Sequence, residues 1–275
     1  QHWCYLSQKK EQPNCEVNSN CKGIKQSPIN IVTKNVIYDE SLTPLHFVDY
    51  DVKGSSQWKI ANNGHTVKVT LSTNPKIGGG GLIRKYKAVE FHLHWGVQDA
   101  QLYFPGSEHS IDGEKQAMEL HIVHIREDAL DLADAKNFAD GIAVLAFFIQ
   151  VGGQILILYL KSNGKLMEPL PLNSLLPPEY ELEKYYRYEG SLTTPDCHET
   201  VIWTVFEKPI QLSLSQFSTV HFGANNSTFM SENFRPAQFL NDRSVYWSSA
   251  SSLLPPVKGL MSVLILPYIL NSLFQ

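Results

Sequence analysis

Two histidines stand two residues apart in the segment VEFHLHWGV, residues 89–97. The segment is rich in apolar and aromatic residues, so we expect it to form a buried strand. Side chains two residues apart on a strand point to the same face, so His92 and His94 look into one space, with Glu90 in phase with both. Because a histidine in a strand is more often a hydrogen-bonded core or surface residue than a metal ligand, this pair alone leaves both interpretations open.

A second segment, AMELHIVHI (residues 117–125), has the same alternation, with Glu119 and His121 on one face and Val123 next along it. If the two segments pair as neighbouring strands, three imidazoles converge with the carboxylates of Glu90 and Glu119 close behind them. Three neutral histidines with one open position are typical of catalytic zinc, whereas structural zinc is closed by four protein ligands. The carboxylates suit the role of acceptors that fix the tautomer of a ligating imidazole. Together the two segments favour a zinc site over buried core histidines.

The rest of the chain must supply the strands that position these residues. Short runs rich in β-branched and aromatic residues, separated by Gly, Pro, Asn and Asp, predict a mainly β chain. The runs are INIVT (29–33), WKIANNGHTVKVTLS (58–72), AVEFHLHWG (88–96), AMELHIVHI (117–125), IAVLAFFIQV (142–151) and TVIWTVF (200–206). Helical patterning is confined to residues 127–140 and 212–220, where Ser213 is placed to cap the second helix. We expect a mainly β (α+β) fold, a single domain with a large, mostly antiparallel, twisted central sheet and short peripheral helices.

Composition places the chain among ordinary folded proteins. It has 275 residues, of which 43% are hydrophobic and 18% are charged, enough to build a large core in one domain. No internal repeat or Gly/Ser/Pro-rich linker divides the sequence, so we expect residues 1–247 to form one domain. The formal net charge of -4 and a sequence without a basic stripe argue against nucleic-acid binding.

The cysteines favour an oxidising compartment. Cys4, Cys15, Cys21 and Cys197 form no C-x-x-C pair, so disulfides are favoured over a structural zinc site or a redox motif. Free buried thiols in a cytosolic protein are the alternative. The partial clustering of the cysteines near the N-terminus suggests a short loop from Cys4 to Cys15 and a long one from Cys21 to Cys197. No signal segment opens the sequence, so we expect the leader of a secreted form to have been removed already.

The C-terminal tail also indicates the secretory pathway. Small residues, Ser248–Ser252, precede a short spacer and an apolar stretch from Leu260 to the end. That order matches a signal for attachment of a glycosylphosphatidylinositol (GPI) anchor, which predicts that residues 248–275 are removed on maturation. A membrane span and a core element are the alternatives, but the stretch is shorter than the ~20 residues that a bilayer needs. Glycosylation acceptors at Asn225 and Asn226, in NNST, agree with secretion.

Seven segments resemble the α-class carbonic anhydrases. They are QSPINI (26–31), NNGHTV (62–67), FHLHWG (91–96), GSEHSIDGEKQAMELHIVH (106–124), YEGSLTTPDC (188–197), VIWTVF (201–206) and FRPAQFLNDR (234–243). The resemblance runs from about Trp3 to Arg243, and the cysteines and tail are similar to those of the extracellular, GPI-anchored type-four branch. It implies disulfides from Cys4 to Cys15 and from Cys21 to Cys197, and a lipid anchor at the extracellular face of the plasma membrane.

The resemblance implies a zinc lyase. His92, His94 and His121 would bind Zn²⁺, and zinc-bound hydroxide would hydrate carbon dioxide reversibly to bicarbonate and a proton. Thr193 would accept the hydrogen bond of that hydroxide and donate its own hydrogen to the buried carboxylate of Glu108. Sulfonamides and anions are the expected inhibitors.

Further residue roles are implied by the same resemblance. His65 would be the proton shuttle, because an imidazole with a reference pKa of about 6.5 can take up the released proton and pass it to buffer. Tyr5 and Asn63 would order the chain of waters leading to it, and Glu90 and Glu119 would orient the zinc ligands. The residues that would border the substrate are Val123, Val144, Leu192, Thr194, Val201 and Trp203. Without the zinc site, the apolar members of this set would be read as ordinary core residues.

Two residues depart from the family pattern. Glu90 stands where the family usually has glutamine, and a carboxylate there predicts a stronger donor at His92 and a raised pKa of the zinc-bound water. Lys68 follows His65 by three residues, where the family commonly has a neutral side chain. A nearby cation disfavours imidazolium, which predicts a lowered pKa for His65.

A catalytically impaired carbonic-anhydrase-like ectodomain used for binding is the alternative function. Silent members of the family generally lose one or more zinc histidines, whereas this sequence keeps all three, together with Thr193 and Glu108. An unrelated three-histidine metallohydrolase would leave those two residues and the valine-rich pocket unexplained. We therefore expect an active enzyme.

Overall fold

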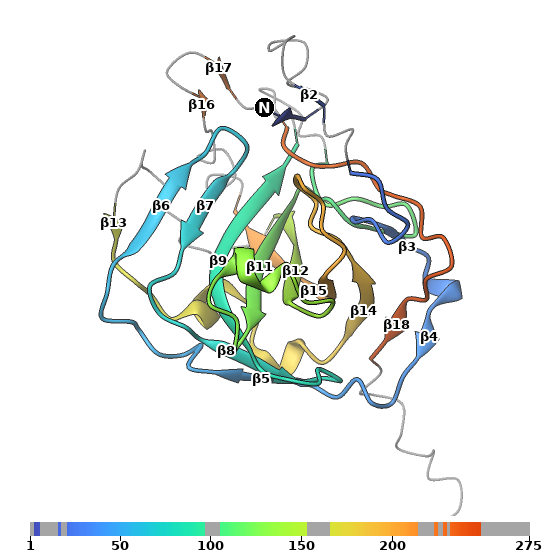
Figure 1. Ribbon diagram of the computed structural model, residues 1–275, viewed down its shortest axis with the longest axis horizontal. Coiled ribbons are helices and arrows are strands. Elements are labelled where there is room, and N and C mark those ends of the chain that lie inside the picture. Colours follow the sequence, from blue (N-terminus) through green and yellow to red (C-terminus); the bar gives the residue numbers. More distant parts are fainter. Residues whose placement is uncertain are drawn as a thin grey trace, which may run out of the picture.

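The computed structural model describes residues 3–5, 16–17, 21–96, 105–152, 166–213, 223–224, 228–229 and 232–248. Within them a sheet of twelve strands dominates the molecule (Figure 1). Ten of its strands lie in the spatial order β13 (Leu166–Met167), β6 (Trp58–Asn62), β7 (Val67–Thr70), β9 (Tyr86–Trp95), β11 (Met118–Arg126), β12 (Ile142–Val151), β15 (Val201–Leu212), β14 (Tyr185–Gly190), β18 (Tyr246–Trp247) and β4 (Ile37–Tyr38). The other two, β5 (Leu45–Val48) and β8 (Lys76–Gly79), pair with each other, and β8 also pairs with β9.

The sheet is mixed and mostly antiparallel. Its β12–β15 and β18–β4 pairs are parallel, and the other pairs described within it are antiparallel. Each predicted run of apolar residues contains a strand. The first run contributes β3 (Asn30–Ile31), which pairs with β10 (Ser110–Ile111) outside the large sheet. The prediction of a single, mainly β domain is confirmed.

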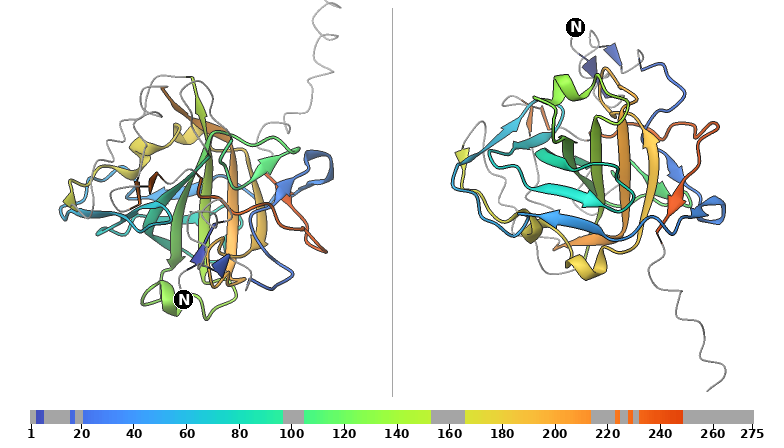
Figure 2. Two further views of the ribbon diagram at one scale, coloured as in Figure 1. Left: turned by 90° about the horizontal axis from the view of Figure 1, so that it is seen from above. Right: turned by 60° about the horizontal axis from the view of Figure 1, so that its bottom comes forward.

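The remaining elements are small. The only α-helix in the described part of the chain is α1 (Leu132–Ala135), which falls inside the predicted stretch 127–140. Its N-cap residue Asp131 accepts a hydrogen bond of 2.8 Å from the backbone N of Asp134. The other short elements are η2 (Thr33–Asn35), η3 (Leu172–Leu175), η4 (Glu179–Glu181), β1 (Trp3–Cys4), β2 (Glu16–Val17), β16 (Gly223–Ala224) and β17 (Thr228–Phe229). Figure 2 shows α1 and β1 at the same end of the molecule.

The central strands are buried on both faces, because an apolar cluster packs against each side of the sheet. Phe91 and Leu93 of β9 belong to one cluster, while Val144 and Trp203 belong to the other. Burying one large apolar side chain contributes about 1.5–3 kcal/mol to the stability of the fold. A shift of the strands would expose these side chains, so the two clusters stabilise the observed register. The second cluster lies on the face to which the polar residues of β9 and β11 point.

The Cys21–Cys197 disulfide predicted from the sequence is present, with Cα atoms 5.3 Å apart. Cys4 is also disulfide-bonded. Outside the described residues lie Cys15, Asn225, Asn226, the part of the second predicted helix after Ser213, and residues 249–275.

The described chain ends in a residue that is fixed to the sheet. Ser248 is 1% exposed, and its hydroxyl accepts a hydrogen bond from the backbone N of Tyr185 (2.8 Å) and donates one to the carbonyl of Glu183 (2.8 Å). The folded domain therefore extends through Ser248, one residue past the boundary expected from the small-residue stretch. No helix in the described ranges is long and apolar enough to cross a bilayer.

Candidate active site

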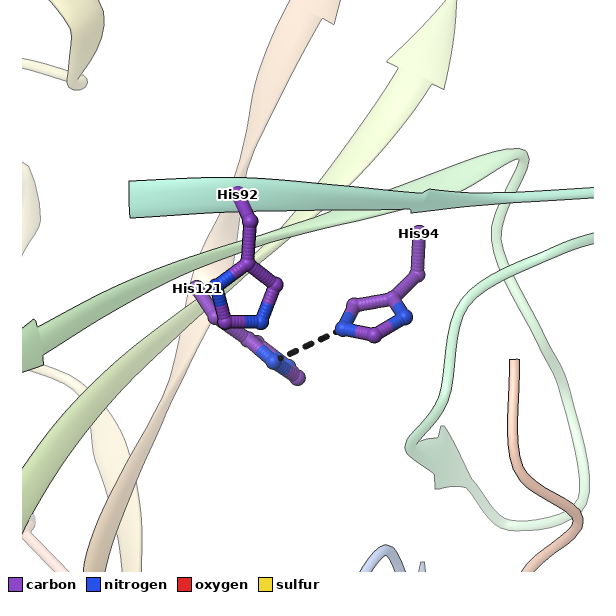
Figure 3. Close-up of side chains that lie close together, drawn as sticks. All are labelled: His92, His94 and His121. Carbon is purple, nitrogen blue, oxygen red and sulfur yellow. Dashed lines mark hydrogen bonds between the residues drawn. The ribbon is translucent and has the colours of Figure 1, made fainter. Parts of the chain in front are cut away.

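The two histidine strands pair as the sequence predicts. β9 and β11 are antiparallel neighbours, with His92 opposite His121 and His94 opposite Glu119. Figure 3 shows His92 and His94 projecting from one strand and His121 from its neighbour, with the three rings turned toward one another. One ring nitrogen from each lies within 4.8 Å of the others, a spacing that one metal ion can bridge.

A β-bulge adjoins the site and changes the phase of β9. The register with β11 shifts between Val123 and His124, so that Val123 faces Glu90 but His124 faces Ala88. Val89 is the extra residue, and beyond it Ala88 packs in the cluster on the far side of the sheet. Bulges of this kind often lie next to active sites, where they redirect a side chain. Strict alternation in the sequence therefore describes β9 only from Glu90 onward.

In two of the imidazoles, one ring nitrogen makes a hydrogen bond that fixes the orientation of the ring. The second nitrogen of each ring points toward the other histidines. His94 Nδ1 lies 2.8 Å from the carbonyl oxygen of Asn233, and His121 Nε2 lies 2.6 Å from Oε1 of Glu119. Because those oxygens only accept, both nitrogens carry the hydrogen, and His94 Nε2 and His121 Nδ1 are bare in the neutral rings. These bare nitrogens are 3.1 Å apart (Figure 3). Two lone pairs that face each other so closely call for a cation between them.

His92 completes the donor set. Its Nδ1 is 3.5 Å from Oε1 of Glu90, which leaves Nε2 for a ligand. Burial disfavours imidazolium, so it lowers the pKa of His94 well below the usual value and that of His121 to about 4. Histidine must be neutral to bind a metal, so these rings are in the binding form near neutral pH. Three imidazoles beside a pocket fit the requirements of a catalytic zinc ion.

Glu119 is held by a buried network behind the ligands. Its two oxygens accept hydrogen bonds from the backbone N (2.8 Å) and Nδ1 (2.6 Å) of His109 as well as from His121. Burial alone would raise the pKa of Glu119, but the electrostatic attraction of the His109 and His121 rings, together with the hydrogen bonds from their side chains, holds it well below the usual value. The Tyr188 hydroxyl lies 2.6 Å from His109 Nε2 and 2.9 Å from Oγ of Ser27. Glu119 is therefore an ionised acceptor of fixed orientation.

The histidines line a pocket of about 220 Å³. The sequence-predicted residues that line it are Tyr5, Asn63, His65, Glu90, His92, His94, His121, Val123, Val144, Leu192, Thr193, Thr194 and Trp203. Glu108 and Glu119 lie behind the wall. Val201 is 2% exposed and packs in the same apolar cluster as Val144 and Trp203, but it is not part of the lining. The structure thus gathers residues from seven sequence segments around one space.

Thr193 lies on the wall of this pocket, and Glu108 lies behind it, hydrogen-bonded to the Thr193 hydroxyl. Glu108 is 1% exposed, and its Oε1 accepts a hydrogen bond of 2.8 Å from the backbone N of Arg235. Burial raises the pKa of Glu108 to about 8, against the opposing hydrogen bonds from Arg235 and from the Thr193 hydroxyl. Its Oε2 is 3.5 Å from His94 Nε2, so a dication held by the histidines would favour the carboxylate.

His65 lies at the pocket wall on a turn. Its ring stacks on the indole of Trp3, with centroids 3.8 Å apart and planes inclined by 14°. Asn63 Oδ1 accepts from the backbone N of His65 (2.9 Å) and of Thr66 (2.8 Å), so Asn63 shapes the turn that presents the imidazole. Tyr5 is 4% exposed, and burial raises its pKa well above the usual value, which keeps the phenol neutral.

Lys68 forms an ion pair inside the pocket. Its Nζ is 3.0 Å from Oε2 of Glu90, while the other oxygen of Glu90 faces His92. The sequence predicts that Lys68 lowers the pKa of His65 and that Glu90 makes His92 a stronger donor, but it does not predict that these two charges pair with each other.

Several lining residues were not predicted as site residues. They are Trp3, Thr66, Leu132, Lys136 and Pro195. Pro195 follows the SLTT segment directly and could have been included on that ground. The others come from the N-terminal strand, the turn after His65 and α1, and nothing in their local sequence pattern indicates where those elements fold.

Comparison with known proteins agrees with the geometry. The family described as eukaryotic-type carbonic anhydrase matches residues 9–249. Carbonic anhydrase 4 of Rattus norvegicus is 40% identical over 274 residues, covering 92% of this chain and 86% of the relative. Carbonic anhydrase 4 of Oryctolagus cuniculus is 41% identical over 275 residues, covering 93% and 87%, and carbonic anhydrase 12 of Homo sapiens is 35% identical over 282 residues, covering 96% and 78%. The chain belongs to the eukaryotic-type carbonic anhydrases.

Proposed function

We propose that this protein catalyses the reversible hydration of carbon dioxide to bicarbonate and a proton at the three-histidine site. The observation that carries the proposal is the convergence of three imidazoles on a pocket that Thr193 also lines, with Glu108 behind Thr193. When bound there, Zn²⁺ supplies a Lewis acid that brings the pKa of its water into the neutral range, as established for carbonic anhydrases. His92, His94 and His121 are the residues that would hold it.

Thr193 orients the attacking oxygen. Its hydroxyl has one hydrogen, and ionised Glu108 can only accept, so Thr193 donates to Glu108 and its own oxygen must accept from the nucleophile. That arrangement leaves a lone pair of the nucleophile free to attack carbon. The substrate is linear and nonpolar, so it needs an apolar wall more than hydrogen bonds. Val123, Val144 and Trp203 supply that wall, with Leu192 and Thr194 nearer the exposed side and Val201 supporting it from behind.

His65 takes up the proton released in each turnover. An imidazole titrates near neutral pH, so it can accept the proton from the pocket and release it to buffer. Stacking of the His65 ring on Trp3 supports this role, as does the lining of the same pocket by Tyr5, Asn63, His65 and the three zinc histidines. A chain of water molecules in that pocket would connect His65 to the zinc ligands.

The protein is proposed to act at the outer face of the plasma membrane. The Cys21–Cys197 disulfide supports an oxidising compartment. Residues 1–247, with Ser248, form the catalytic domain, and the small-residue, spacer and apolar pattern of the remaining tail supports removal of that tail and attachment of a GPI anchor. Asn225 and Asn226 are proposed glycosylation sites. Sulfonamides and small anions are proposed inhibitors, bound beside Thr194.

The proposed function is tested by zinc content and activity measured on the same sample. Protein secreted from cells should contain about one zinc per chain and hydrate carbon dioxide, and removal of the metal by a chelator should abolish the activity until zinc is returned. A sulfonamide should inhibit the hydration. A folded, secreted protein that holds no zinc and is inactive would instead favour a binding ectodomain.

Thr193→Ala should lower kcat/KM for hydration by about a hundredfold, because the nucleophile loses the acceptor that orients it. Thr193→Ser keeps the hydroxyl and should retain most of the activity. Stopped-flow measurement with a pH indicator checks both variants, and zinc content should equal that of wild type in each. Equal activity of the alanine and serine variants would contradict the role given to the hydroxyl.

A further inference from the structure

The Lys68–Glu90–His92 contact joins two neighbouring strands at the metal site. Lys68 is on β7 and lies opposite His92 of β9 in the sheet, while Glu90 lies opposite Thr70. Lys68 Nζ is 3.0 Å from one oxygen of Glu90, and the other oxygen is 3.5 Å from His92 Nδ1. All three side chains line the same pocket. One carboxylate is therefore paired with an ammonium on one side and lies beside the His92 imidazole on the other.

The two distances show that Glu90 interacts more strongly with Lys68 than with His92. At 3.0 Å the ammonium is within ordinary hydrogen-bond range, whereas 3.5 Å to His92 is beyond it, and His92 Nδ1 has no hydrogen-bond partner among the described residues. The Glu90 side chain is 15% exposed and that of Lys68 is 36% exposed, so the carboxylate is much the more shielded of the two. A shielded carboxylate without a counter-charge would be costly. Lys68 supplies that counter-charge from within the pocket wall.

We propose that Lys68 is a positioning residue for the metal site, which acts through Glu90 by fixing the carboxylate beside His92 and cancelling its charge. Glutamate and lysine together then act as one neutral pair beside the metal site. An unpaired carboxylate this close to a dication would strengthen metal binding, and an unpaired ammonium would weaken it. The paired residues leave the net charge around the metal ion as a neutral amide would. This inference rests on the proposed zinc site.

Zinc dissociation constants of the full chain, measured by competition with a chromophoric chelator at one pH, test the pairing. Lys68→Met should bind zinc about tenfold more tightly than wild type, and Glu90→Gln about tenfold more weakly. The double variant Lys68→Met/Glu90→Gln should return to within about threefold of wild type. The visible absorption bands of the Co²⁺-substituted protein should move in each single variant and return in the double variant, which a purely structural role of Lys68 would not produce.

A matched control is available on the same sheet. Lys76 of β8 pairs with Glu127 at 2.6 Å and is not among the residues that line the pocket, so Lys76→Met should leave zinc affinity and the Co²⁺ spectrum unchanged. The proposal for Lys68 is overturned if Lys68→Met behaves as the control does, or if the double variant binds zinc as weakly as Glu90→Gln. A folded wild-type protein that binds neither metal would overturn the zinc site itself, a different result from either of these.

Discussion

Replacing His94 by alanine should abolish stoichiometric zinc binding and lower kcat/KM for carbon dioxide hydration by about three to five orders of magnitude. Stabilisation by a metal Lewis acid amounts to several kcal/mol, and each 1.36 kcal/mol of barrier is about a factor of ten in rate. The fold holds His94 firmly, since it is 1% exposed and its Nδ1 donates to the carbonyl of Asn233 at 2.8 Å. With alanine there, two imidazoles remain, fewer than the three protein ligands of known catalytic zinc sites.

The measurement is zinc content by atomic absorption beside stopped-flow hydration. His46→Ala is the matched control, because His46 is an exposed strand histidine of β5 that lies outside the pocket. It should keep zinc and activity. Alanine at position 94 leaves the Asn233 carbonyl without its donor, so the fold of the variant is checked by circular dichroism and by its urea unfolding curve. Chelator-treated wild type should show the same loss of activity with no substitution at all. A His94→Ala protein that retains one zinc per chain would remove His94 from the ligand set.

The convergence of the three histidines was predictable because the sequence signal for it lies within two short segments. The i and i+2 spacing of His92 and His94 puts both on one face of a strand, and the same rule holds for Glu119 and His121. Only the pairing of the two strands had to be assumed, and the observed register puts His92 opposite His121. The alternation of side chains along two strands was therefore enough to predict that these histidines and Glu119 lie together.

The contacts that complete the site come from residues far apart in the chain. The carbonyl of Asn233 that orients His94, and the backbone N of Arg235 that holds Glu108, are 139 and 127 residues away from their partners. A backbone group has no signature in a sequence, so contacts of this kind cannot be read from residue types. Only the family resemblance could place Thr193 beside Glu108.

The partner of Lys68 is a second feature that the sequence did not predict. Its position three residues after His65 predicted an effect on that imidazole, because both belong to one segment. The structure pairs Lys68 with Glu90 across two strands. Charges on neighbouring strands find partners according to register and side-chain length, and β7 and β9 pair without a shift here, with Lys68 opposite His92 and Thr70 opposite Glu90. The Lys68–Glu90 contact is diagonal across the two strands, so it depends on a pairing that spacing within one segment does not reveal.

Replacing both Cys21 and Cys197 by serine should lower the free energy of unfolding by about 5 kcal/mol. The disulfide joins residues separated by 176 positions, and in the chain-entropy account a loop of that length gives about this figure, near the top of the usual range. The double substitution leaves no free thiol from this pair. Urea unfolding followed by tryptophan fluorescence measures the loss, and wild-type protein kept under reducing conditions should lose at least as much.

Loss of this disulfide should also reach the active site, because Cys197 belongs to the segment that carries Thr193. The backbone N of Cys197 donates to the carbonyl of Thr194 (2.9 Å), and its carbonyl accepts from Nε2 of Gln26 (3.2 Å). We expect kcat/KM of the double variant to fall about tenfold at a temperature where it stays folded, while its zinc content is unchanged, because the ligands stand on β9 and β11 and not on this segment. A variant that loses stability but keeps full activity would show that the hydrogen bonds to Gln26 and Thr194 hold the Thr193 segment without the covalent link. A variant with unchanged stability would mean that the unfolded chain gains little freedom when the loop is opened, so the entropy account would fail for this protein.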